Sequence, residues 1–252
     1  MMTGPNARDR TEDGSAMASH DPLDVWRRPE RSGVGPKPKH SRAAIVAAAI
    51  EIADKDGMAA VSIRRVAADI GAGAASLYRH LNSHDELVEL MVDTVGGEYD
   101  LGPSAEPPRA QLLNLARQGR AIMHRHPWLA PLLLTRPSLG PNSLAYLERA
   151  LAALVTVDMP GPAKLQTVAM LTAISSAFVQ NELAQSAGPG AIDHGNKERL
   201  QHLSAAFQSG KYPHLAGALA GHLEQQSPDE TFMGVIENYL AGAGLPVSVG
   251  FD

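Results

Sequence analysis

The residues with the clearest chemical potential lie between positions 62 and 81, where the sequence reads SIRRVAADIGAGAASLYRHL. Tyr78 and His80 would offer hydroxyl and imidazole donors to phosphates or bases, and Arg64 could reach a phosphate or a guanine edge. Small residues at positions 73–75 would let the backbone approach DNA closely. The same residues could equally be surface groups of a plain helical bundle, because short Ala-rich helix pairs occur in many bundles.

Two short helices must position these groups. Ser62 can cap the first, IRRVAADI, and Gly71 fits the left-handed position that ends it. The second, ASLYRHL, would turn Leu77 and Leu81 inward. In a helix-turn-helix the first helix braces the second in this way, so that the second can enter the major groove.

Helices are also predicted on both sides of this pair. The segment SRAAIVAAAIEIADKDG has apolar residues at helical spacing, and Gly57 ends it. Ser83 then opens a fourth helix with a capping box. In that box the Ser83 hydroxyl would accept from the Glu86 N–H, and the Glu86 carboxylate would bond the Ser83 N–H.

Beyond residue 100 the sequence predicts one helix after another, separated by proline and glycine. No stretch alternates with a period of two for long enough to form a strand. The predicted fold class is therefore all-α. An N-terminal three-helix helix-turn-helix DNA-binding domain (40–99) precedes a helical-bundle ligand-binding and dimerisation domain (100–252), and a disordered or loosely attached arm (1–39) comes first.

The charge distribution suits contact with a polyanion. The net charge is -5, yet residues 37–84 contain seven Lys/Arg against four Asp/Glu. Helical domains often differ this much by chance, so the charge alone decides little. The chain has no cysteine, and it lacks a secretory signal or an apolar run of roughly 18 residues. We therefore expect a cytoplasmic protein without a membrane partner.

The sequence displays no catalytic or metal-binding motif. It has no nucleophile elbow, P-loop or HExxH, and GAGAAS is explained by the helix turn. His124 and His126 are two apart, which splays them on a helix, while His214 and His222 are too far apart for one ion. We expect neither an enzyme nor a bound metal or cofactor.

The stretch SIRRVAADIGAGAASLYRHLNSHDELVELMVD resembles the signature of TetR (tetracycline repressor) family regulators, and RAAIVAAAIEIADKDGMAAV is similar to the family's first helix and loop. The match covers residues 42–95 and keeps the order and spacing of Gly71, Leu77, Tyr78, His80, Leu81 and Leu87. Residues 126–154 also resemble a C-terminal ligand-binding domain of many members. The resemblance implies a homodimer that binds a roughly palindromic operator, with repression relieved by a small-molecule effector.

Carried over position by position, the resemblance assigns DNA contacts to Arg64, Ala74, Ala75, Ser76, Tyr78, Arg79 and His80. His84 stands where the family often has a phosphate-binding lysine, so this contact would be weaker or pH-dependent. Ala74 and Ala75 can touch a thymine methyl group but make no hydrogen bonds.

Candidate effector contacts are residues on the mostly apolar helices: Met91, Arg117, Arg120, His124, Met170, Phe178, Asn181 and Glu182. Each polar residue could also be an ordinary surface group, and methionines more often fill cores. Helices 163–186 and 228–242 are the candidate dimer interface. Small residues there permit close approach (Ala169, Ala173, Ser176 and Ala177), and larger ones supply burial (Met170, Phe178, Val179 and Leu183).

Two alternatives stay open at this point. Basic residues of the arm could enter the neighbouring minor groove or belong to a solvated tail: Arg27, Arg28, Arg31, Lys37 and Lys39. The chain could also be a helical ligand-binding or adaptor dimer that keeps the fold without operator binding.

Overall fold

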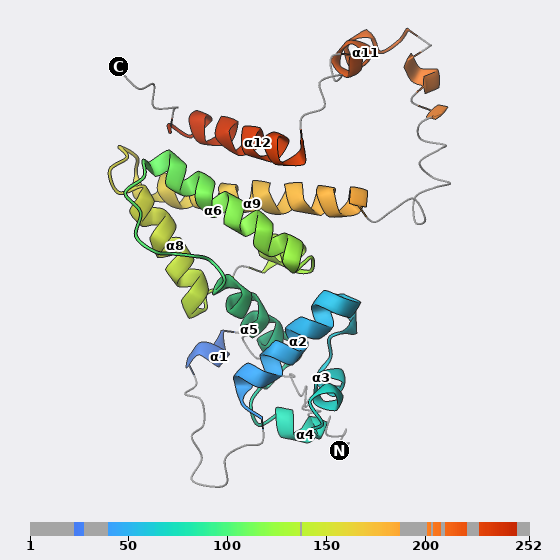
Figure 1. Cartoon of the computed structure of the whole chain (residues 1–252), viewed down its shortest axis with the longest axis vertical. Coiled ribbons are helices and arrows are strands. Elements are labelled where there is room, and N and C mark those ends of the chain that lie inside the picture. The colour runs from blue at the N-terminus through green and yellow to red at the C-terminus, as the bar shows by residue number, and fades with distance from the viewer. Residues whose placement is uncertain are drawn as a thin grey trace, which may run out of the picture.

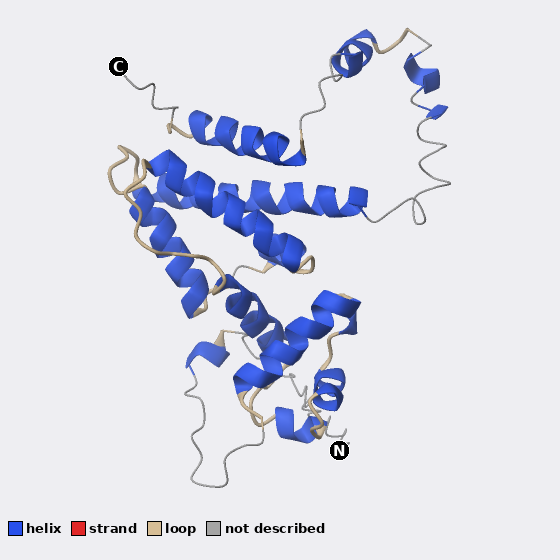
Figure 2. Ribbon diagram, viewed as in Figure 1, coloured by secondary structure: helices blue, strands red, loops and turns tan. Residues whose placement is uncertain are grey.

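A computed structural model describes residues 23–27, 40–136, 138–186, 201–202, 204–207, 210–220 and 227–245. These residues form helices and turns, and no strand occurs among them (Figures 1 and 2). The all-α prediction is confirmed. None of the described helices is long and apolar enough to cross a membrane.

The N-terminal part consists of α2 (Arg42–Asp56), the 3-10 turn η1 (Met58–Ala60), α3 (Ile63–Asp69), α4 (Ala74–Leu77) and α5 (His84–Gly96). The predicted N-cap of α3 and the predicted glycines at helix ends are confirmed. The Ser62 hydroxyl accepts from the Arg65 N–H at 3.1 Å and caps α3. Gly57 and Gly71 have φ values of 82° and 66°, a region that favours glycine. The helix α4 is shorter than predicted, because the chain continues as turns after Leu77.

The start of α5 differs in one contact from the predicted capping box. The Ser83 hydroxyl accepts from the Glu86 N–H at 3.1 Å, as predicted. The Glu86 carboxylate, however, accepts from the Asn82 N–H at 2.8 Å and not from that of Ser83. The predicted return bond is therefore wrong, because the buried Glu86 side chain reaches one residue further back.

The C-terminal part contains α6 (Pro108–Arg125), α7 (Leu129–Thr135), α8 (Pro141–Ala153), α9 (Gly161–Ser186), α11 (Pro213–Ala220) and α12 (Pro228–Gly242). In Figure 1, α12 runs beside α9 and α6. Leu112 of α6, Leu171 of α9 and Phe232 of α12 are fully buried in the core between α6, α8, α9 and α12.

A second core joins the two parts of the chain. It holds buried residues of α2–α5, such as Ile45 and Leu87, together with Ile122 near the end of α6, Leu129 of α7 and Val179 of α9. The boundary predicted near residue 99 therefore does not separate two cores. Because interiors are close-packed, this shared core fixes the orientation of the N-terminal part on the C-terminal part.

Part of the predicted arm is ordered. Residues 24–27 form α1 (Asp24–Arg27), in which Val25 is buried against α5. The Trp26 indole N–H donates to Glu89 of α5 at 2.9 Å. Arg27 pairs with Asp24 of the same turn at 3.0 Å. The other basic residues of the arm lie outside the described residues: Arg28, Arg31, Lys37 and Lys39.

Candidate nucleic-acid interface and domain junction

The segment of α4 and the turns after it is anchored by two leucines. Leu77 and Leu81 are fully buried, as predicted. Tyr78 between them is 57% exposed, and Ala75 and Arg79 are also exposed. The anchored leucines hold the exposed side chains on the outer face of a short rigid unit. This is the geometry that a recognition helix needs.

Three predicted DNA contacts are partly engaged within the chain. Ala74 is half-buried and packs against the shared core. The Ser76 hydroxyl donates to the Gly73 carbonyl at 2.6 Å, so its oxygen keeps acceptor capacity. His80 is also half-buried. The role of these residues in DNA binding stays a prediction.

The two arginines of α3 differ in their surroundings. Arg65 forms an ion pair with Asp56 at 2.9 Å and so ties α3 to the end of α2. Arg64 is exposed. It is therefore the better placed of the two for an external phosphate or base, and its role in DNA binding stays a prediction.

His84 contacts the chain through one ring nitrogen. Its Nε2 lies 3.2 Å from the Val61 carbonyl oxygen, which can only accept. Nδ1 would then be the atom for a phosphate, and it carries a proton only when the ring is charged. The role of His84 in DNA binding stays a prediction.

A buried carboxylate of α5 caps a helix of the regulatory domain. Asp93 is 2% exposed and accepts from the Ser143 backbone N–H at 2.9 Å. It also accepts from the side-chain amide of Asn142 at 3.2 Å. These donors belong to the first turn of α8, where backbone N–H groups lack partners within the helix. Asp93 therefore binds the positive end of α8 and joins the two parts of the chain.

A second carboxylate, one turn earlier on α5, joins three segments. Glu89 accepts from the Trp26 indole at 2.9 Å, from the Ser138 hydroxyl at 2.7 Å and from the Leu139 N–H at 3.3 Å. Gly140 completes this junction, because a Cβ there would collide with Asp93 and with the Trp26 ring. Only glycine leaves the space that α1 and α5 require.

Beyond the C-terminal end of α5, His126 lies between two carboxylates. Its Nδ1 is 2.8 Å from Asp54 of α2, and its Nε2 is 2.8 Å from Glu98, just after α5. The Trp128 indole also donates to Asp54, at 2.7 Å. Burial raises the pKa of Glu98, but the hydrogen bonds and charges of Arg125 and His126 outweigh burial and lower it.

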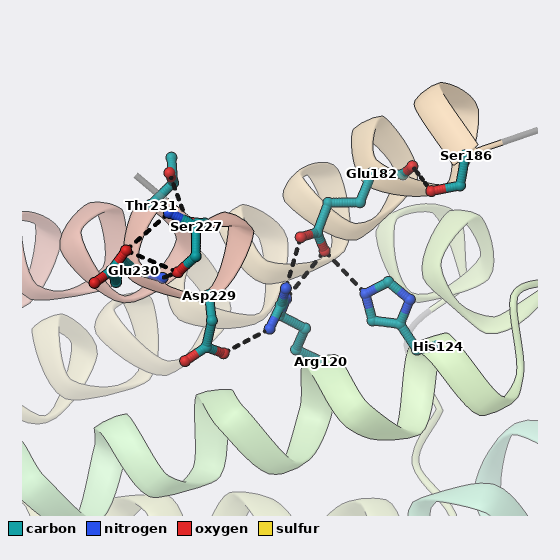
Figure 3. A network of polar contacts seen from close by, with 8 residues as sticks. All are labelled: Arg120, His124, Glu182, Ser186, Ser227, Asp229, Glu230 and Thr231. Carbon is teal, nitrogen blue, oxygen red and sulfur yellow. Dashed lines mark hydrogen bonds and ion pairs between the residues drawn. The ribbon is translucent and has the colours of Figure 1, made fainter. Parts of the chain in front are cut away.

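Three of the predicted effector contacts come together and bond one another (Figure 3). The Arg120 guanidinium makes two hydrogen bonds to Glu182, at 2.7 and 3.0 Å, and one to Asp229 at 2.8 Å. His124 Nε2 lies 2.9 Å from Glu182. Burial raises the pKa of Glu182, but Arg120 and His124 lower it overall. The cluster ties α6 to α9 and α12.

The other predicted effector contacts lie elsewhere. Met91 is fully buried in the shared core, and Arg117 is exposed on α6. Met170 is 42% exposed, and the exposed Asn181 accepts from Gln185 at 2.7 Å. Phe178 is half-buried and packs edge-on against the Phe232 ring, with 5.2 Å between the ring centroids. The structure does not gather these five side chains around one space, and their role stays a prediction.

A group of hydroxyl-bearing side chains lies inside the regulatory domain, and it was not identified from the sequence. The rings of Tyr99 and Tyr146 are 4.7 Å apart, and the Tyr146 hydroxyl is 3.4 Å from that of Thr172. Burial raises the pKa of both phenols. Ser175, one turn further along α9, is 3% exposed, and its hydroxyl has no hydrogen-bond partner among the described residues.

Known proteins match both parts of the chain. A family model described as bacterial regulatory proteins of the tetR family matches residues 45–91, and one described as the tetracyclin repressor-like C-terminal domain matches residues 103–244. The HTH-type transcriptional repressor DrrR1 of Streptomyces coeruleorubidus is 33% identical over 201 residues, which cover 77% of this chain and 73% of DrrR1. An HTH-type transcriptional regulator of Saccharopolyspora erythraea is 34% identical over 195 residues (77% and 80%).

Solved structures of ActR from Streptomyces coelicolor are also similar. The apo structure has a TM-score of 0.67 at 28% identity and covers 83% of this chain and 96% of that one. The complex with actinorhodin has a TM-score of 0.70 at 26% identity and covers 83% and 97%. These similarities confirm what the sequence signature implied: the chain belongs to the TetR family of transcriptional regulators.

Proposed function

We propose that this regulator is a cytoplasmic repressor that binds a palindromic operator as a homodimer and leaves it when a small molecule binds the regulatory domain. The observation that carries the proposal is the short recognition unit, in which buried Leu77 and Leu81 present exposed Tyr78 and Arg79. Arg64 on the bracing helix adds a cation beside it. Such a unit docks in the major groove with phosphate contacts around it.

Gel retardation of the gene's own upstream DNA tests this proposal. Wild type should shift one or more fragments, and Tyr78→Phe combined with Arg64→Ala should weaken the shift at least tenfold, since each lost contact is worth about 1–3 kcal/mol. Arg117→Ala, an exposed arginine of α6, is the control and should bind like wild type. An unchanged shift in the double variant would favour the alternative of a helical adaptor dimer without operator binding.

The homodimer would use exposed stripes of α9 and α12. Leu165, Ala169 and Met170 are exposed on α9, and Val235 on α12. Ser176 and Val179, which the sequence suggested for this interface, are fully buried within the chain and serve its own core. Small exposed residues such as Ala169 would let a partner helix approach closely.

A charge placed in the stripe should break the dimer. Ala169→Glu is expected to give a monomer in sedimentation at micromolar concentration, because a carboxylate buried without a partner costs several kcal/mol. Ala145→Glu, at an exposed position of α8, should leave the dimer intact. A wild-type monomer at that concentration would contradict the proposed dimer.

The effector would bind the hydroxyl groups of half-buried Tyr146 and Thr172 and of buried Ser175. A buried hydroxyl without a partner costs about 1–3 kcal/mol, and a polar group of an effector would remove that cost. ActR, a relative of 26% identity, is solved in complex with actinorhodin. Actinorhodin is therefore a suitable first probe, and Tyr99 and Phe178 would supply aromatic surface for it.

Ser175→Ala tests the effector site without a ligand. The variant should be as stable as wild type or up to about 1 kcal/mol more stable, because it removes an unsatisfied polar group. Thr172→Ala should be destabilising, since the Thr172 hydroxyl donates to the Val168 carbonyl at 3.2 Å. A loss of more than about 1 kcal/mol in Ser175→Ala would mean that its hydroxyl has a structural partner, and the proposed site would be rejected.

A further inference from the structure

The imidazole of His126 connects three segments at the junction of the DNA-binding and regulatory parts. Both ring nitrogens lie 2.8 Å from a carboxylate oxygen, one on Asp54 of α2 and one on Glu98 after α5. His126 is 8% exposed, so water cannot easily replace either contact. Arg125, the preceding residue, also bonds Glu98.

These contacts specify the charge state of the ring. A carboxylate only accepts hydrogen bonds, and a neutral imidazole carries a single N–H. In a neutral ring, one of the two short contacts would therefore set a nitrogen lone pair against a carboxylate oxygen. The imidazolium donates from both nitrogens. It also balances the cluster, because the charges of His126 and Arg125 then offset those of Asp54 and Glu98.

We propose that His126 is a proton-dependent latch: as an imidazolium it holds the end of α2 to the C-terminal ends of α5 and α6, and its deprotonation loosens the DNA-binding helices from the regulatory domain. Histidine is the side chain that ordinarily changes charge near neutral pH. His126 is a positioning residue, since it acts on the DNA-binding helices through Asp54.

The latch lies on the same helix end as the cluster of Figure 3. Arg120 and His124 of α6 are bound to Glu182 of α9, and His126 follows directly after the helix. Arg120 and His126 are six positions apart, which corresponds to about 9 Å along the end of α6. A movement of α9 therefore reaches the latch through a short and stiff element.

Asp54→Asn separates the latch from a merely structural contact. The amide N–H could donate to a neutral Nδ1, and the amide oxygen could still accept from the Trp128 indole. Both contacts of the His126 ring would then persist when only one of its nitrogens carries a proton. His214→Gln, at an exposed position of α11, is the control histidine.

Two measurements on the full chain test the latch. Nitrogen NMR of wild type near about pH 7 should show N–H on both His126 nitrogens. Hydrogen exchange of the last α2 amides, corrected for the intrinsic rate, should accelerate about fivefold or more between about pH 6.5 and 8.5 in wild type and in His214→Gln. Asp54→Asn should abolish this acceleration. A neutral ring near pH 7, or the same acceleration in Asp54→Asn, would overturn the proposal.

The consequence for DNA rests on the proposed function. A loosened DNA-binding part must be ordered again on the operator, which weakens binding. Operator affinity should therefore fall with rising pH more steeply in wild type than in Asp54→Asn, and equal slopes would overturn this consequence. Because the spectroscopic and exchange measurements need no DNA, failure to bind an operator would reject the proposed function and leave the latch standing.

Discussion

Asp93→Ala should destabilise the protein by about 3 kcal/mol, because Asp93 caps α8 from a different part of the chain. Its bond to the Ser143 N–H resembles an N-cap, which is worth about 1 kcal/mol. A negative charge at a helix N-terminus adds about 0.5–1 kcal/mol. The bond from the Asn142 amide to a charged acceptor adds about 1.5 kcal/mol.

Two further variants separate the charge from the hydrogen bonds. Asp93→Asn keeps an acceptor oxygen for the Ser143 N–H and loses the charge, so it should cost about 1 kcal/mol. Glu148→Ala removes an exposed carboxylate of the same helix α8 and should change stability by less than about 0.5 kcal/mol.

Guanidinium unfolding followed by tryptophan fluorescence is the assay. Both tryptophans of the chain, Trp26 and Trp128, lie at the domain junction, so their emission reports its loss. The midpoint should fall for Asp93→Ala while the slope stays unchanged, which marks a change in stability alone. If Asp93→Ala cost no more than Glu148→Ala, the capping of α8 by α5 would not be a source of stability, and the reasoning would be refuted.

Three other substitutions probe the domain junction and the cluster around Glu182. Gly140→Ala should lower the free energy of unfolding by about 1–3 kcal/mol, since the added Cβ would collide with Asp93 and Trp26. Gly161→Ala should be near neutral, because no atom lies within 4 Å of a Cβ at that position. Trp26→Phe should cost about 1–2 kcal/mol, measured by circular dichroism, because buried Glu89 loses a donor. The pKa of Glu182 is lower in the folded chain than its ordinary value of 4.5. The contribution of Glu182 to the free energy of unfolding is therefore complete above pH 4.5 and is lost as the pH falls through the pKa of the folded state. The stability difference between wild type and Glu182→Gln should therefore stay constant near neutral pH and shrink in acid.

The features predicted correctly from the sequence are those that depend on neighbouring residues. Ser62 and Ser83 cap helices through N–H groups three residues away, and Gly71 takes a backbone conformation that its own lack of a Cβ allows. The burial of Leu77 and Leu81 follows from helical periodicity. Each of these features involves residues only a few positions apart, so it can be recognised in a single sequence.

The domain junction was missed because its contacts join residues far apart in the chain. His126 and Asp54 are 72 residues apart, and Trp26 and Glu89 are 63 apart. One signal was available. Acidic residues recur at helical spacing on α5 at positions 86, 89 and 93, among the apolar residues of positions 87–92, and buried carboxylates require donors. That pattern predicts partners for α5 without identifying them.

Three polar residues of the regulatory domain were identified from the sequence, but the kind of contact they make was not. The sequence singled out Arg120, His124 and Glu182 as unusual on apolar helices, and the structure places them together. Helical spacing could not distinguish a contact between α6 and α9 from a contact with an effector, because both put a charge on a buried face. Because α9 has apolar residues on most sides, its sequence also did not indicate which stripe packs in the core and which is exposed.

The shared core limits how an effector signal can reach DNA. Because Ile122 of α6 and Val179 of α9 pack among the helices of the DNA-binding part, that part cannot swing freely on a linker. The end of α6 is bound both to α9, at Arg120, and to α2, through His126, so a movement of this helix end would act on both. The contacts at that helix end are side-chain ion pairs, which are lost over a shift of about 1–2 Å, whereas close-packed apolar contacts adjust less readily. The ion pairs at the end of α6 therefore join the two parts of this regulator, as do the contacts of Asp93 with the first turn of α8.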